Sequence, residues 1–135
     1  MAAVSTDQVT RQRGSDRASH PAKASTLHYE GVMAFLNAGL AEAGINSGNN
    51  KFAGIVARKT DNSAGADSAL AVEVFRKGHF LLTGASLAIG DVGATVYATD
   101  NYTITKTSTN NVAVGKIVNF VSSTQVWVDI EGFAV

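Results

Sequence analysis

Three histidines are the residues of this sequence best suited to acid–base or metal chemistry. His20 and His28 lie in and just after a polar N-terminal segment, and His79 follows a glycine in a predicted strand. Their spacing does not match a pattern that places two rings on one metal ion. The chain has no cysteine, which excludes disulfides and thiolate ligands. We therefore expect ordinary surface or edge histidines, with no metal and no cofactor.

Two glycine-containing segments resemble ligand-binding loops only in part. Residues 61–67 read DNSAGAD and place Asp61, Ser63, Gly65 and Asp67 at alternate positions, as in a calcium loop. A calcium loop has more carboxylates and a later bidentate glutamate. Gly84, Gly90 and Gly93 lack the Lys and Ser/Thr that a phosphate-binding loop requires. No spacing of Ser, His and Asp supports nucleophilic catalysis. We predict a turn at 61–67, with a weak cation site as the alternative, and a protein that is not an enzyme.

The charge balance gives no reason to expect binding to nucleic acid or to a membrane. Lys and Arg number 11, Asp and Glu number 11, and charged residues make up only 16% of the chain, against about 25% in an average domain. The nearest basic group, Arg58, Lys59, Arg76 and Lys77, falls at predicted strand ends. A surface this poor in charge favours coverage by partner proteins.

Residues 1–25 differ in composition from the rest of the chain. They are polar, contain the only proline, and lack the apolar region of a signal peptide. Such a segment buries too little apolar surface to fold alone. We expect a flexible N-terminal arm that either stays disordered or becomes ordered on a neighbouring subunit, where Arg11, Arg13 and Arg17 are its candidate contact residues.

From residue 26 onward, short apolar or alternating runs are separated by turn formers. This pattern predicts one all-β domain over 26–135, a small antiparallel β-barrel or jelly-roll-like sandwich behind an extended N-terminal arm. Residues 38–43 are compatible with a helical turn, although Gly39 and Gly44 limit its length. The run at 79–82 is expected to form a hairpin with 69–75. The candidate strands are 32–36, 53–57, 69–75, 79–82, 95–98, 102–107, 112–121 and 126–130.

Alternation within the last two strands separates core positions from outward positions. In 112–121 it places Val114 and Ile117 on opposite faces. In 126–130 the two valines and the isoleucine share one face, so Trp127 points the other way. An exposed tryptophan is a common interface anchor. Trp127 is therefore a candidate contact residue, and the alternative is that both faces of this strand are covered.

Four blocks of the sequence resemble the small capsid cement (decoration) proteins of tailed bacteriophages. The resemblance covers about residues 22–132 and implies a β-barrel or jelly-roll protein without a cofactor or a reaction. It also implies a homo-oligomer, a dimer or trimer, on the outer capsid surface of the virion, where it bridges neighbouring major capsid protein subunits. The blocks are KASTLHYEGVMAFLNAGLA at 23–41, FAGIVARKTDNSAGADSALAVEVFR at 52–76, IGDVGATVYATDNYTITKTSTNN at 89–111 and VAVGKIVNFVSSTQVWVDIEG at 112–132.

Two other structural roles remain open at this point. One is a trimeric decoration protein with a different β topology, because strand count alone does not fix topology. The other is a carbohydrate-binding β-sandwich on the virion surface, which needs exposed aromatic residues gathered on one face. Its candidates, Tyr97, Tyr102 and Trp127, lie on different predicted strands. In each case we expect a soluble protein made in the host cytoplasm, because no apolar run approaches the roughly 20 residues of a membrane-spanning helix.

Overall fold

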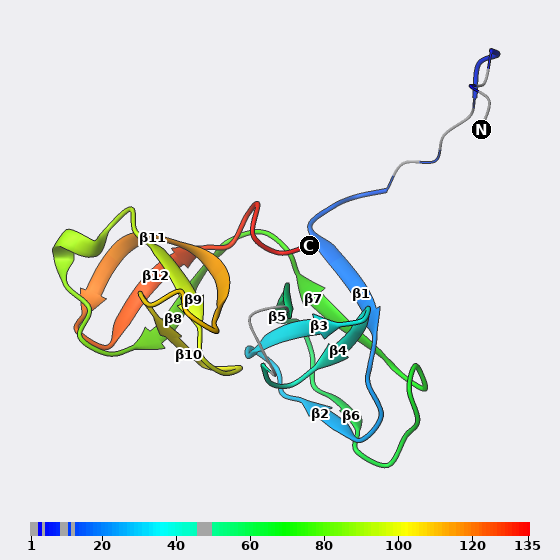
Figure 1. Ribbon diagram of the computed structural model, residues 1–135, viewed down its shortest axis with the longest axis horizontal. Coiled ribbons are helices and arrows are strands. Elements are labelled where there is room, and N and C mark those ends of the chain that lie inside the picture. Colours follow the sequence, from blue (N-terminus) through cyan, green and yellow to red (C-terminus); the bar gives the residue numbers. More distant parts are fainter. Residues whose placement is uncertain (1–2, 4, 9–10, 12, 46–49) are drawn as a thin grey trace.

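The chain folds into two β structures that lie side by side (Figure 1). The computed structural model describes residues 3, 5–8, 11, 13–45 and 50–135. Apart from one short 3-10 helix, every regular element in these residues is a strand. The expected all-β class, with antiparallel strands and a closed barrel, is confirmed.

The N-terminal half forms a five-stranded sheet in the order β1-β7-β5-β3-β4, with every neighbouring pair antiparallel. Its inner face is lined by small buried residues, which leave room for the strands to curl closely around one another. The strands are β1 (Arg17–Pro21), β3 (Met33–Asn37), β4 (Leu40–Glu42), β5 (Lys51–Val56) and β7 (Ala71–Phe75).

This sheet curls until its two edge strands meet. Ala22, directly after β1, forms an isolated parallel bridge with Ala41 of β4. The backbone N–H of Lys23 donates to the carbonyl of Ala41 at 3.0 Å. We call Ala22, Lys23 and Ala41 the seam. Because Ala22 and Ala41 are fully buried, the seam closes the curled sheet around its small-residue core.

Strand β1 lies inside the segment that the sequence predicts to be a flexible arm. Arg17 pairs opposite Phe75 and Pro21 opposite Ala71, so the whole strand adds to the edge of β7. The hydrogen bonds to β7 pair the backbone N–H and C=O groups of a segment that has little apolar surface of its own. Amino-acid composition alone does not reveal such a pairing. The described residues before 17 form no strand or helix and extend away from the body (Figure 1).

The C-terminal half is a closed five-stranded barrel in the order β10-β8-β12-β11-β9. Closure is completed by a short parallel pairing between β10 and β8. The 3-10 helix η1 (Ile89–Asp91) lies in the connection from β8 to β9. The strands are β8 (His79–Gly84), β9 (Thr95–Ala98), β10 (Thr103–Thr105), β11 (Val112–Ser122) and β12 (Gln125–Asp129).

A β-bulge in β11 overturns the predicted alternation of that strand. The register against β9 shifts between Ala113 and Gly115, and Val114 and Ile117 are consequently both buried in the barrel. A side chain at Gly115 would collide with the backbone oxygen of Asp129. The missing Cβ is therefore what lets β12 approach the bulge.

Two further predictions from the sequence are wrong. The expected helical turn at 38–43 is a hairpin between β3 and β4, with Ala38 and Gly39 at φ 52° and 84° in the two-residue turn. The expected hairpin between 69–75 and 79–82 does not form, because β7 pairs with β1 and β5 whereas β8 pairs with β12 and β10. Alternation identifies a strand but not its partner.

The two halves share one apolar core. Met33, Phe35, Phe52 and Ile55 of the curled sheet belong to the same buried cluster as the barrel interior. The rings of Phe35 and Phe52 lie 6.0 Å apart at an angle of 45°. A small antiparallel ribbon of β2 (Thr26–His28) and β6 (Thr60–Asn62) completes the curled half.

Candidate protein-binding surface

One outward wall of the barrel carries an aromatic and aliphatic pair at its centre. Trp127 of β12 lies directly opposite Leu81 of β8 and opposite Asn119 of β11. Trp127 is 40% exposed and Leu81 42% exposed. The buried valines on either side of Trp127 hold its strand against the core, so the expected outward direction of this side chain is confirmed.

Polar rows border this pair along the strands on both sides. One row contains Lys116, Asp129 and His79, and the imidazole Nε2 of His79 lies 3.8 Å from a carboxylate oxygen of Asp129. An apolar centre with a polar border is the usual arrangement of a protein-binding hot spot. We call this wall the Trp127 face. It consists of Lys116, Asn119 and Ser122 on β11, Asp129, Trp127 and Gln125 on β12, and His79, Leu81 and Thr83 on β8.

A second group of exposed apolar side chains lies beside β11. Ile89 of η1 is 74% exposed and Val92 47% exposed. The loop that carries them is held to the β11–β12 hairpin by a hydrogen bond from Leu87 N–H to the carbonyl of Ser123. Val121, near the same hairpin, is 49% exposed. The barrel thus presents apolar surface at this end as well as on the Trp127 face.

The arginines predicted in the arm take different positions. Arg11 and Arg13 are exposed. Arg17 is held by a 2.8 Å ion pair with Glu73 and lies 4.6 Å from the ring centre of Phe75. The structure therefore does not bring Arg17 to the Trp127 face but uses it to fasten β1 to β7, while Arg13 and Arg17 line a hollow of about 200 Å³.

Glu73 is shared by two arginines. Arg58 approaches its second oxygen at 2.6 Å. The hydrogen bonds from Arg17 and then Arg58 lower the pKa of Glu73 below its usual value. Because the arginine side chains are more than half exposed, both pairs add little stability, and the Arg17 pair mainly orients β1.

The other three residues of the basic group at the predicted strand ends also have local partners. Arg76 donates to the carbonyls of Val135 and Ser15. Lys59 lies 5.5 Å from the ring centre of Tyr29. Lys77 pairs with a glutamate of the C-terminal turn at 3.8 Å. Each of these three cations is therefore engaged in a contact within the chain.

The DNSAGAD segment begins at the end of β6 and continues as a turn from Ser63. The carboxylate of Asp61 accepts from the backbone N–H and the hydroxyl of Ser63. The amide of Asn62 donates to the carbonyls of Lys23 and Ala66. Among the described residues, no group of three or more His, Cys, Asp or Glu is placed to hold a metal ion.

The aromatic residues of the carbohydrate-binding alternative do not gather on one face. Tyr97 lies on β9 and Tyr102 in the turn before β10, whereas Trp127 lies on β12, and β11 separates β12 from β9. Sequence reasoning missed Leu81, the neighbour of Trp127, because only the pairing of β8 with β12 reveals it.

Comparisons with known proteins add no relative. No protein-family model, curated protein or solved structure matches this chain. Within the part of the chain that the structure describes, no helix has the length and apolar character needed to cross a membrane.

Proposed function

We propose that this chain is a capsid cement (decoration) protein, which binds the outer surface of a tailed-phage head and bridges neighbouring major capsid protein subunits. It is a structural component of the virion with no reaction and no cofactor. The observation that carries the proposal is the Trp127 face, where an exposed tryptophan and Leu81 lie at the centre of a polar-bordered wall. The resemblance of residues 22–132 to capsid cement proteins supplies the class of partner.

The rigidity of the wall supports this role. The barrel is closed, so its strands have hydrogen-bonded neighbours on both sides. Val126 and Val128, on either side of Trp127, are fully buried. A contact residue fixed in this way loses little conformational entropy on binding, which favours affinity.

The extended N-terminal segment supplies a second point of attachment. Arg11 and Arg13 are exposed on a segment that leaves the body at β1 (Figure 1). One copy could thus contact one capsid subunit through the Trp127 face and a neighbouring subunit through this segment. A protein that binds only the assembled shell stabilises that shell by mass action, and a dimer or trimer adds avidity without new kinds of contact.

Co-sedimentation with empty phage heads that lack the protein tests the proposal. We expect the native chain to sediment with the heads and Trp127→Ala to bind at least about tenfold more weakly, since central tryptophans carry a large share of interface energy. Tyr102→Ala is the matched control, because Tyr102 is 57% exposed but lies outside the Trp127 face. Equal retention of the two variants, or no sedimentation of the native chain, would contradict the proposal.

A further inference from the structure

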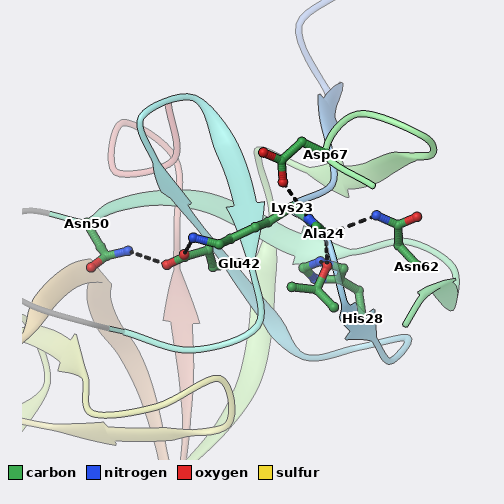
Figure 2. A network of polar contacts seen from close by, with 8 residues as sticks. Lys23, Ala24, His28, Glu42, Asn50, Asn62 and Asp67 are labelled. Carbon is green, nitrogen blue, oxygen red and sulfur yellow. Dashed lines mark hydrogen bonds and ion pairs between the residues drawn. The ribbon is translucent and has the colours of Figure 1, made fainter. Parts of the chain in front are cut away.

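Lys23 is the hub of a polar network at the seam (Figure 2). Its N–H donates to Ala41, as described above. Its carbonyl accepts from the hydroxyl of Thr26 at 2.7 Å and from the amide of Asn62 at 2.9 Å. Its ammonium group pairs with Glu42 at 3.0 Å. The end of β1 is therefore fastened by contacts around a single residue, in addition to the ladder with β7.

A fully buried histidine adjoins this hub. His28 is 0% exposed, and its Nε2 lies 3.1 Å from the hydroxyl oxygen of Thr26. Because that hydroxyl donates to Lys23, its oxygen accepts from His28, which places the proton of the neutral ring on Nε2. Nδ1 makes no hydrogen bond of good geometry to the described residues. Protonating Nδ1 would thus place a positive charge in a site without water contact.

A second histidine lies on β1 itself. His20 pairs opposite Val72, which lines the inner face of the curled sheet. Its Nε2 is buried and has no hydrogen-bond partner among the described residues. Burial lowers the pKa of His20, and the charges of Arg76 and Arg13 lower it further. Protonation of the His20 imidazole on β1 is therefore also unfavourable in the folded state.

The charged groups around His28 do not offset the cost of charging it. Burial lowers its pKa, and the nearby Ala41 carbonyl raises it by a smaller amount. Of the neighbouring charges, Lys23 and Glu42 pair with each other. Asp67 accepts from the backbone N–H of Ala24 (Figure 2), and Asp61 accepts from the backbone N–H of Ser63.

The charged groups around His20 are mainly cationic. Arg76 and Arg13 disfavour its protonation. Glu73, on the neighbouring strand, lies opposite Ser19 and is taken by the ion pairs with Arg17 and Arg58. The third histidine, His79, differs from both, because its side chain is 56% exposed on the outer wall of the barrel.

We propose that mild acid opens the seam: protonation of His28 and His20 releases β1 and the following residues through Ser25 from the curled sheet, while the closed barrel stays folded. His20 lies on β1 and His28 lies beside the Lys23 network, whereas His79, the third histidine, is exposed on the outer wall of the barrel. Release frees β1 and residues 22–25 from the curled sheet and uncovers the small-residue core.

The direction of the pH effect on seam opening follows from proton linkage. Both pKa values are lowered from 6.5 in the folded state, so the released state binds more protons as the pH falls. The stabilisation of the seam is complete above about pH 6.5 and is lost progressively below it. At pH 5.0 each histidine contributes a shift of up to about 30-fold in the opening equilibrium.

Amide hydrogen exchange measured by NMR tests this proposal. Protection factors, which correct for intrinsic exchange, are compared at pH 7.5 and pH 5.0 for the amides of Ala22 and Lys23 at the seam and for Val126 and Val128 in the barrel. We expect seam protection to fall at least about tenfold and barrel protection to hold. Seam protection that is constant with pH, or a fall of equal size in both regions, would overturn the proposal.

Histidine variants identify the groups responsible. His28→Gln and His20→Gln should each reduce the pH dependence at the seam, and His79→Gln, the exposed control, should leave it unchanged. Because His28→Gln could prevent folding, the pKa of each imidazole is also measured in the native chain from the NMR shifts of its ring. A His28 ring that titrates at or above 6.5 would refute its role.

Discussion

Replacing Gly115 by alanine probes the bulge that positions the Trp127 face. A Cβ at this position would collide with the backbone oxygen of Asp129 and stand 2.5 Å from Cγ1 of Val128. Both neighbours belong to β12 and follow Trp127 directly in the chain, and Val128 is fully buried. The added methyl group can therefore be accommodated only by moving β12 away from β11.

The expected loss of stability of Gly115→Ala follows from this crowding. Inserting a methyl group into a packed core costs about 1–3 kcal/mol, and here a backbone atom must move, which favours the upper part of that range. For a urea dependence of about 1–3 kcal/mol per molar, we expect the midpoint of unfolding to fall by roughly 1 M. Trp127 fluorescence is a suitable probe, because this residue is the only tryptophan and lies on the displaced strand.

Gly90→Ala is the matched control. A Cβ at Gly90 would meet no atom within 4 Å, so this variant should unfold at the native midpoint. We also expect Gly115→Ala to change the emission of native Trp127, since the face would be displaced before the barrel unfolds. Equal midpoints for the two variants, with unchanged emission, would refute the argument that the bulge at Gly115 sets the position of β12.

Two further predictions concern the attachment of β1. Removing residues 1–14 should leave the melting temperature unchanged, because it keeps β1 and the Arg76 contact with Ser15. Removing residues 1–22 should lower the melting temperature, because it takes away β1 and Ala22 of the seam; equal melting curves by circular dichroism would contradict this. Glu73→Gln should reduce the loss of folding stability in acid, because the hydrogen bonds from Arg17 and then Arg58 lower the pKa of Glu73. The stability that the ionised Glu73 contributes is present above about pH 4.5 and is lost as the pH falls through the lowered pKa. Urea midpoints at pH 6 and pH 3 measure this, and an unchanged pH dependence would show that these exposed pairs contribute nothing.

The sequence predicts the fold class and the outward direction of Trp127, because both depend on short-range alternation. In β12 the pattern is uninterrupted, so alternate residues reach the core as expected. In β11 the same reasoning fails at Gly115, because a bulge shifts the register. A lone glycine in a strand pattern is a known sign of a bulge, and it is the signal by which the shift could have been found.

The seam could not be predicted from the sequence because its contacts join distant segments. Lys23 lies in a segment whose composition favours disorder, and its partners Asn62 and Glu42 come from separate strands. The order of β1 depends on its pairing with β7, which runs from Arg17↔Phe75 to Pro21↔Ala71 and so joins residues at least 50 positions apart. Likewise, the pairing of Leu81 with Trp127 depends on how the barrel closes. Such pairings are tertiary properties that local propensity does not encode.

Cryo-electron microscopy of phage heads reconstituted with the protein tests the central claim most directly. The proposal predicts the barrel bound to the outer shell with the Trp127 face buried against major capsid protein, and Trp127 and Leu81 inside the contact. A map in which the barrel attaches by another wall and leaves the Trp127 face open to solvent, or in which the heads carry no added density, would contradict it.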